Sequence, residues 1–493
     1  MKNFSLSLYA FHLRHTITEL PGEVVADANL LWENLVKVGE GSLPFTELKD
    51  LRSKLICYQN GKYEPKREIG RKTERLIDTK VLILSSLEIT EGFKINANLQ
   101  PFLLNDTYAV DLTLVPEPPN ISIDIPQLQH FKPSSLLPSN IQASLGQTLW
   151  IYGEVDPSEN CDELAKNLAI ALVADTNLNP VPTQQGELFD SLLFEYQAVD
   201  LDEPENPAKQ CHILIVINNS QAATGKLAQE AYDWLLNLLC SYHKILYIYQ
   251  LARHRYREAK TIYSDLENKI QKFNSLTSEN KTQLSDLKSL MGEIPKKSFD
   301  YTRCLQDIQT HHTAITTNIT NYRICLENIQ TIDSGNSPQS WQDFINKDCK
   351  KWQEQVQTDI NYLAPGQELF GQLVDTICGI VETEQAESDR EQAERDKQQA
   401  KQQTKSDREQ AERDRTLNNT IQILGIGFGG GAIISGVIVQ HIDKINQPLT
   451  AISLDNPPHP FYASLLLSLL ATLFFIGIGL LITKRQYYPR DKK

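Results

Sequence analysis

Over residues 1–220 the spacing of apolar and polar residues switches repeatedly between that of strands and that of helices. Residues 4–13 alternate with the period of a strand, and residues 24–38 repeat apolar side chains at helical spacing. Residues 212–218 (HILIVIN) form a nearly continuous apolar run, which suits a strand covered on both faces. The pattern predicts an α+β or α/β domain, with proline-rich or acidic surface loops at 116–138 and 181–210 and further strands at 80–89, 109–115, 148–155 and 192–199.

Helical spacing dominates residues 221–366, where strand signals are few. Proline, glycine and small polar residues are the expected places for these helices to stop. We therefore expect a helical region with breaks near Ser278, at Pro295, in the turn at 333–338 and at Pro365 with Gly366.

The most apolar part of this helical region, residues 232–251, also carries Asp233, Asn237, His243 and Lys244. A charge at the centre of a membrane helix costs about 2.5 to 3.5 kcal/mol. The segment therefore predicts a buried helix of a soluble domain rather than a membrane span.

A charged stalk is expected at residues 367–420. After Pro365 the next proline is Pro448, so one helix could run over residues 368–440, a length of about 110 Å. Residues 384–415 hold ten acids, eight bases and no apolar side chain larger than alanine. Without apolar side chains to bury, this stretch excludes a hydrophobic coiled-coil dimer. It favours a solvated helical spacer, with a flexible charged linker as the alternative.

The stalk contains a repeat, SDREQAERDK from Ser388 and SDREQAERDR from Ser406. The offset of 18 residues equals five helical turns, so both copies place matching residues on one face. Each copy offers an i,i+4 ion pair worth a few tenths of a kcal/mol, Glu391 with Arg395 and Glu409 with Arg413.

Two charge-free apolar segments follow, at residues 421–439 and 461–483. At 1.5 Å per residue they span about 28 and 34 Å, enough to cross the hydrocarbon layer. Five Lys or Arg residues precede the first segment within twenty residues, and five follow the second in the tail 484–493. The loop 440–460 holds only Lys444. The sequence therefore predicts a two-span membrane protein in contact with lipid, with both termini in the cytosol.

One face of the first predicted span is small and polar from end to end. Such a stripe suits pore lining in an oligomer. It equally suits close helix packing, since glycines spaced by four let backbones approach. The two readings are compatible, and the residues of the stripe are Asn418, Gln422, Gly425, Gly429, Ala432, Gly436, Gln440 and Asp443.

Composition excludes some classes of function. The chain of 493 residues has 62 acidic and 48 basic side chains and a net charge of −14, which does not favour nucleic acid as a partner. The amino terminus lacks the apolar core of a signal peptide, so we expect the bulk of the chain in the cytosol. Eight widely spaced cysteines show no C-x2-C pair and are expected to be buried thiols in a reducing compartment.

No catalytic motif is complete, so we do not expect an enzyme. A phosphate-binding Walker loop at Gly225-Lys226 would need glycine at position 220 and Ser or Thr at 227, where the chain has Ser220 and Leu227. The G-x-G-x-x-G match that starts at Gly425 lies inside an apolar span with no strand before it, so it reflects composition.

The order of segments resembles the CorA family of divalent-cation channels. A cytosolic α/β domain, helices, one long helix leading into the first span, a short outer loop, a second span and a basic tail occur in that order. The family's Gly-Met-Asn signature is absent, because residues 439–443 read VQHID. The resemblance implies a homo-oligomer and a divalent cation. It also places Gln440 and Asp443 near the outer mouth and Asn418 and Gln422 near the cytosolic mouth.

The leading hypothesis is thus an oligomeric CorA-like channel or transporter gated by its cytosolic domain, without a resident cofactor. A non-conducting, membrane-anchored sensing or interaction protein is the first alternative. A conditional membrane-disrupting effector is the second. Each hypothesis includes a cytosolic ligand or protein partner that the sequence does not identify.

Overall fold

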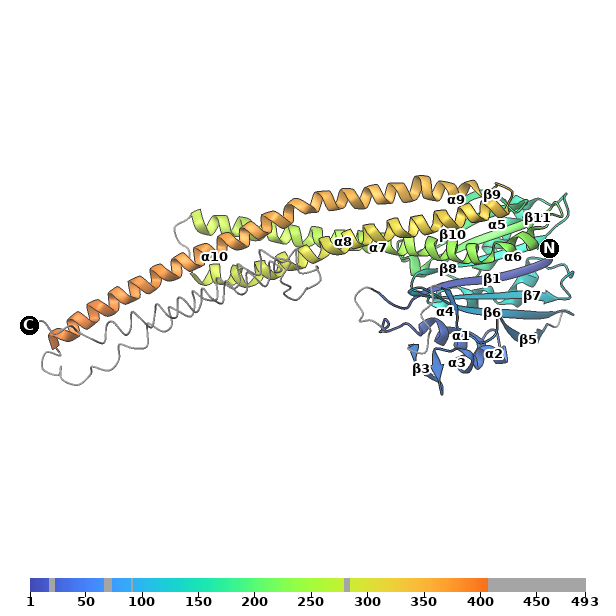
Figure 1. Ribbon diagram of the computed structural model, residues 1–493, viewed down its shortest axis with the longest axis horizontal. Coiled ribbons are helices and arrows are strands. Elements are labelled where there is room, and N and C mark those ends of the chain that lie inside the picture. Colours follow the sequence, from blue (N-terminus) through green and yellow to red (C-terminus); the bar gives the residue numbers. More distant parts are fainter. Residues whose placement is uncertain (17–22, 66–72, 90–91, 279–283, 407–493) are drawn as a thin grey trace, which may run out of the picture. The chain divides into compact units, whose positions relative to one another are not determined.

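The computed structural model describes residues 1–16, 23–65, 73–89, 92–278 and 284–406 (Figure 1). The chain divides into two units, residues 1–384 and 385–493. The predicted segments 421–439, 440–460, 461–483 and 484–493, and the end of the predicted stalk, lie outside the described residues. Within them the mixed α+β class is confirmed, with a large amino-terminal sheet followed by helices.

Strands dominate as far as residue 218, and helices dominate after it. The strands are β1 (Lys2–Leu13), β2 (Tyr58–Gln59), β3 (Lys62–Tyr63), β4 (Thr73–Arg75), β5 (Leu82–Glu88), β6 (Lys94–Leu104), β7 (Thr107–Glu117), β8 (Gly146–Glu154), β9 (Leu178–Leu188), β10 (Ser191–Asp200) and β11 (Cys211–Asn218). The short helices among and just after them are α1 (Leu30–Glu40), α2 (Thr46–Lys49), α3 (Leu51–Lys54), η2 (Pro126–Phe131), η3 (Pro133–Leu136), α4 (Pro138–Ile141), α5 (Cys161–Leu172), η4 (Pro207–Lys209) and α6 (Thr224–Glu230). The later elements are α7 (Tyr232–Ser278), α8 (Leu284–Ile332), α9 (Gln339–Asp343), the π-helix η5 (Phe344–Cys349) and α10 (Lys350–Ser406).

In the described residues nine strands form one sheet, in the order β4-β6-β7-β1-β8-β11-β10-β9, with β5 also paired to β6. The pairs are antiparallel except β8 with β11, which run parallel in a register that sets Thr148 opposite His212. A parallel pair needs a long crossover, and here α5, β9 and β10 lie between the two strands in sequence. As a result β11, late in the chain, lies inside the sheet.

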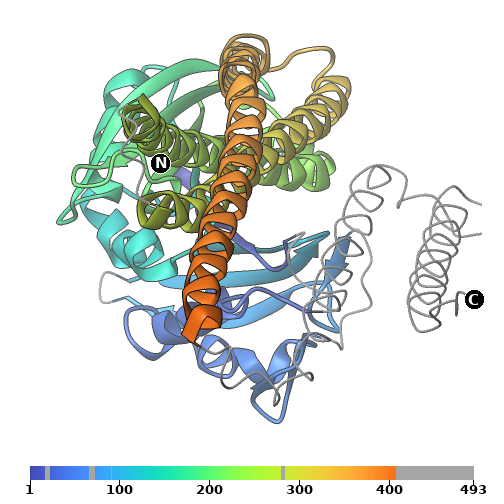
Figure 2. The same cartoon turned by 90° about the vertical axis from the view of Figure 1, so that its left-hand side faces the viewer.

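The central strands of the sheet are buried on both faces, and their alternate residues enter two different cores. Ile213, Ile215 and Ile217 of β11 join α1 and α5 in the first core. Leu214 and Val216 point the other way, into a second core built with α7, α8 and α10. This confirms the prediction for 212–218. Figure 1 shows one end of the α7 and α8 pair beside the sheet, and Figure 2 gives a view toward the ends of these helices.

Helices α7 and α8 form an antiparallel hairpin. The ion pairs between the two helices show their opposite directions, because later residues of α7 pair with earlier residues of α8. The pairs are Arg255 with Asp307 at 3.0 Å, Asp265 with Lys297 at 2.6 Å, and Lys269 with Glu293. These charges are partly exposed, so each pair contributes little free energy. The apolar residues between the two helices, which belong to the second core, hold the hairpin together.

The first part of α10 packs along this hairpin and runs parallel to α7. Tyr249 of α7 stacks on Trp352 with ring centroids 5.0 Å apart, and farther along Tyr263 lies 5.2 Å from Phe370. Between these two contacts, Arg253 forms an ion pair with Asp359, whose side chain is only 3% exposed. The three long helices therefore make one bundle that shares its core with the sheet.

Two of the predicted helix breaks are wrong. Helix α8 continues through Pro295, which is flanked by the ion pairs to α7, and α10 continues through Pro365. Near Pro365 the Tyr301 hydroxyl donates to the Leu363 carbonyl at 2.7 Å, and a Cβ on Gly366 would lie 2.6 Å from that hydroxyl. Tertiary packing thus overrides the local helix-breaking signal. The breaks near Ser278 and at 333–338 are confirmed.

The predicted loop at 181–210 is wrong for residues 181–188, whereas the strand predicted within it at 192–199 is confirmed as β10. Residues 178–188 form the edge strand β9, and β10 follows it. The sequence prediction missed β9 because of Pro180 and Pro182, since proline is compatible with a strand only at an edge or a bulge. Strand β6 and helix α5 also had no counterpart in the sequence prediction.

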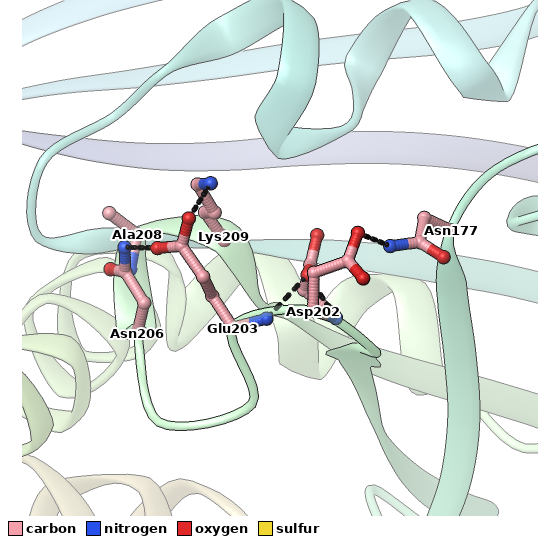
Figure 3. A network of polar contacts seen from close by, with 7 residues as sticks. Asn177, Asp202, Glu203, Asn206, Ala208 and Lys209 are labelled. Atoms are coloured by element: carbon pink, nitrogen blue, oxygen red, sulfur yellow. Dashed lines mark hydrogen bonds and ion pairs between the residues drawn. The ribbon is translucent and has the colours of Figure 1, made fainter.

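The rest of that region, residues 201–210, is a loop with the short helix η4, and its own polar side chains hold it (Figure 3). The Glu203 carboxylate accepts from Asn206 at 2.9 Å and pairs with Lys209. Asn177 donates to Asp202 at 2.7 Å, which ties the loop to the start of β9. The acidic residues Asp202 and Glu203 therefore stabilise the conformation of this loop.

A long, charged helix is present where the stalk was predicted, although it begins at Lys350 rather than after Pro365. Its role as a stalk stays a prediction. Helix α10 is continuous to Ser406, residues 385–398 are exposed throughout, and Glu391 pairs with Arg395 at 3.2 Å. The second predicted pair, Glu409 with Arg413, lies outside the described residues.

Two further predictions are confirmed. All eight cysteines are free thiols, seven of them buried and Cys378 half-buried. Residues 232–251 begin α7 and pack into the second core. Across residues 1–16, 23–65, 73–89, 92–278 and 284–406, no helix combines the length and the apolar character that a membrane crossing requires.

We predict that Asp359→Ala lowers the free energy of unfolding by about 2 to 3 kcal/mol, because it leaves Arg253 without its partner in a largely buried position. Denaturant titration of the full-length chain measures this loss. Asp375→Ala, an exposed site on the same helix, is the matched control and should have little effect. Equal losses in the two variants would contradict a role for the ion pair.

Candidate functional site

The predicted pore-lining residues all lie outside the described residues, so the structure neither groups nor separates them. They are Asn418, Gln422, Gly425, Gly429, Ala432, Gly436, Gln440 and Asp443. The candidate site below is therefore built from the part of the chain that the structure describes.

A pocket of about 260 Å³ lies where the second face of the sheet meets the helices. Strands β9, β10 and β11 form its floor, and α7, α8, α9, the π-helix and the first turn of α10 form its walls. We call it the sheet–helix pocket. Its polar groups include Glu195, His212, Ser340 and Asp348, and its aromatic groups are Tyr242, Tyr322, Trp341, Phe344 and Trp352.

Strand pairing places the two central polar side chains on one face of the sheet. His212 of β11 lies opposite Gln197 of β10, so Glu195, two residues along, is its diagonal neighbour. The register between β9 and β10 shifts beside Glu195, and the Thr183 hydroxyl donates to the Glu195 carbonyl at 3.1 Å. A bulge of this kind redirects side chains and is frequent beside functional sites.

The Glu195 side chain is buried, with 8% of the residue exposed, and two polar side chains face its carboxyl group. The Ser340 hydroxyl donates to Oε1 at 2.5 Å. Nε2 of His212 lies 3.6 Å from Oε2, an electrostatic contact rather than a hydrogen bond. The sheet and α9 thus meet at one buried carboxyl group.

The polar contacts continue behind His212. The Thr148 hydroxyl lies 3.2 Å from Nδ1 of His212 and 2.8 Å from Nε2 of His243. Burial and the neighbouring His212 hold the pKa of His243 well below its usual value, so His243 is neutral. Thr148 thus bridges the two imidazoles, and Nε2 of His212 faces Glu195.

Gly146 makes room for this arrangement. Its φ is +126°, a value that favours glycine, and an added Cβ would lie 2.6 Å from Nδ1 of His243. The first residue of β8 therefore allows α7 to approach the sheet closely enough for His243 to reach Thr148.

The aromatic wall centres on Phe344, the first residue of the π-helix. Its ring centroid lies 4.8 Å from Tyr242, 5.2 Å from Tyr322 and 5.7 Å from Trp352. Short π-helical turns occur frequently at functional sites. This one also supplies Asp348, whose carboxyl pKa is raised mainly by burial.

A larger hollow of about 610 Å³ lies at the carboxyl ends of β8 and β11. Asp124, Asp156 and Glu159 line it, but all three are exposed. Exposed carboxylates are solvated and need no ligand to balance their charge. The sheet–helix pocket, whose carboxylate is buried, is the better candidate.

Among the described residues, no group of three or more His, Cys, Asp or Glu side chains is arranged to hold a metal ion. Comparisons of the chain with models of known protein families, with curated proteins and with solved structures found no match. The resemblance to the CorA family stays a prediction from the order of segments.

Sequence reasoning missed every residue of this pocket. One signal was present: Glu195 and His212 are polar residues inside otherwise apolar strands, a placement that calls for a partner. Ser340, Phe344 and Trp352 carry no comparable signal, since single aromatic or hydroxyl residues after a turn are common.

We predict that Gly146→Ala lowers the free energy of unfolding by about 1 to 3 kcal/mol more than Gly61→Ala does. Both glycines have positive φ, but nothing lies within 4 Å of an added Cβ at Gly61. Denaturant titration of both variants measures the difference. Equal losses would show that the close approach of His243 does not constrain the fold.

Proposed function

We propose that this chain is an integral membrane protein, an oligomeric CorA-like cation channel or transporter that its cytosolic domain gates. The observation that carries the proposal is the continuity of α10. This helix starts at the sheet–helix pocket, runs without a break to Ser406 and precedes the apolar segment 421–439 by only fourteen residues. A helix of this length can couple events at the pocket to a membrane span.

The charged part of α10 supports the same proposal. Its residues 385–398 are exposed and carry both signs of charge, so this stretch tolerates water on all sides. A solvated spacer between a folded domain and a membrane has this character. The stripe from Asn418 to Asp443 would then line the conduction path, and Asp443 would concentrate cations at its outer mouth.

A second candidate is a membrane-anchored sensing protein that does not conduct. The sheet–helix pocket favours it, because a buried binding site coupled to a helical spacer is sufficient for sensing. In this case the small residues of the first span serve helix packing.

In planar-bilayer recordings at low ionic strength we expect Asp443→Asn to lower cation conductance by about twofold or more, because the carboxylates no longer attract cations. Asp455→Asn removes a charge from the same loop but lies off the stripe, and it should change conductance less. An unchanged conductance in Asp443→Asn would count against this residue as part of the pore.

The mass of the full-length chain in detergent separates the two candidates. A pore requires a closed ring, so we expect four or more subunits, which light scattering or native mass spectrometry can count. A monomer would refute the channel and favour the anchored sensor.

A further inference from the structure

A second group of polar side chains lies on the same face of the sheet as the sheet–helix pocket, but apart from it. Asp111 of β7 lies at its centre, opposite Tyr9 of β1 and Gln100 of β6. Tyr9 packs against the second core, and only 4% of Asp111 is exposed. The Asp111 carboxyl group is therefore held inside the molecule, where an ionised group is costly.

Two neutral hydroxyl groups donate to this carboxyl group, one to each oxygen. The Thr113 hydroxyl donates to Oδ1 at 2.7 Å, and the Tyr232 hydroxyl donates to Oδ2 at 2.8 Å. Tyr232 is the first residue of α7. The Asp111 carboxyl group therefore ties the start of this long helix to an interior strand of the sheet.

Ionisable side chains from three other elements act on this group of residues. Burial and the charge of Asp111 raise the pKa of Tyr9 on β1 and of Tyr232 on α7, so both hydroxyls stay neutral. Arg75 of β4 lies over the Phe102 ring, 5.4 Å from its centroid, and its charge acts on Tyr232. Burial is the largest influence on Asp111 and raises its pKa to about 6, although its two hydrogen bonds oppose the rise.

The surroundings can satisfy the carboxyl group in both of its protonation states. The ionised carboxylate accepts from both hydroxyls, whereas the protonated group has to donate one hydrogen bond itself. Thr113 can accept that bond, because its hydroxyl lies 2.7 Å from the hydroxyl of Ser7 and can donate there instead. The bond from Tyr232 is kept in both states, and only the ionised state places a charge inside the core.

Folding therefore favours the protonated state. The pKa of Asp111 rises from its ordinary value of 3.8 to about 6, so between these values the folded chain holds a proton that the unfolded chain has lost. This stabilisation is fully present below pH 3.8 and is lost as the pH rises through about 6.

We propose that Asp111 is a proton-sensitive contact between the sheet and α7, which holds the first turn of the helix more firmly when the carboxyl group is protonated. Acidification would then stabilise this end of the bundle, and a higher pH would weaken its hold on the sheet. The contact borders the same core as Trp352 at the base of α10. Its use as a gating signal rests on the proposed function, whereas the titration itself does not.

Infrared spectroscopy of the full-length chain in detergent tests the titration directly. The spectrum of Asp111→Asn is subtracted from that of the unaltered chain at each pH, because asparagine keeps the shape of the side chain and has no acid group. We expect the difference to contain the band of a protonated carboxyl group at pH 5 and to lose it by pH 7.5. The absence of this band at pH 5, or its persistence at pH 7.5, would overturn the proposal.

Tyr232→Phe tests the link to α7. Without this donor the ionised state loses a hydrogen bond, so the midpoint of the carboxyl titration should move to higher pH. Tyr249→Phe removes a hydroxyl elsewhere on the same helix and is the matched control, which should leave the midpoint where it is. An unmoved midpoint in Tyr232→Phe would refute a contact between Asp111 and the helix.

Denaturant titration measures what the proton contributes to stability. The two pKa values predict that the unfolding equilibrium constant of the unaltered chain rises about tenfold, relative to that of Asp111→Asn, between pH 5 and pH 7.5. Asp78→Asn, at an exposed site, should follow the unaltered chain. The same pH dependence in Asp111→Asn as in the unaltered chain would contradict the proposal.

Should Asp111→Asn fail to fold, Thr113→Val decides. It removes the other donor, so the carboxyl band should titrate at a higher pH than in the unaltered chain, and equal midpoints would overturn the proposal. A titrating band without a cation current would remove the channel and leave this inference standing, and a current without the band would do the reverse.

Discussion

The second face of the sheet has to be covered, and most of the structure depends on how this is done. Strands β1, β8, β10 and β11 place apolar side chains on that face, and α7, α8 and the start of α10 supply the surface that buries them. Non-directional apolar burial is the main source of stability here, as in other folded proteins. Since neither layer can bury its face alone, the sheet and the helical bundle form one core. A displacement of the bundle would therefore disturb the apolar contacts of the sheet.

Several polar side chains lie inside this shared core and contact one another. A row of polar side chains crosses the contact between the sheet and the helices. In spatial order they are His243, Thr148, His212, Glu195 and Ser340. Each imidazole and hydroxyl has a polar neighbour, and the Glu195 carboxyl group lies 3.6 Å from the His212 imidazole. In an interior that is otherwise apolar, an ionised group is costly unless it is paired. The π-helix and the register shift between β9 and β10 border the sheet–helix pocket, and Gly146 makes room for His243.

Much of the fold could be predicted from local patterns. The alternation in β1, the apolar run of β11 and the spacing of α7 were correct, because burial on one or two faces fixes the period of apolar residues. The errors have a common cause. Pro295 and Pro365 signal a break, and Pro180 and Pro182 signal a loop, yet contacts to other elements keep α8, α10 and β9 intact. Propensity is a weak prior when tertiary packing opposes it.

By itself, the sequence determined the mixed class of the chain, the order of sheet, helices and charged stalk, and the buried state of most cysteines. Each of these follows from composition or from the spacing of residues near one another in the chain. Only the tertiary structure decided where the sheet–helix pocket lies. Glu195, His212, Tyr242 and Phe344 come from four elements, and no spacing relates them. Their proximity results from strand register and helix packing, which depend on the whole core.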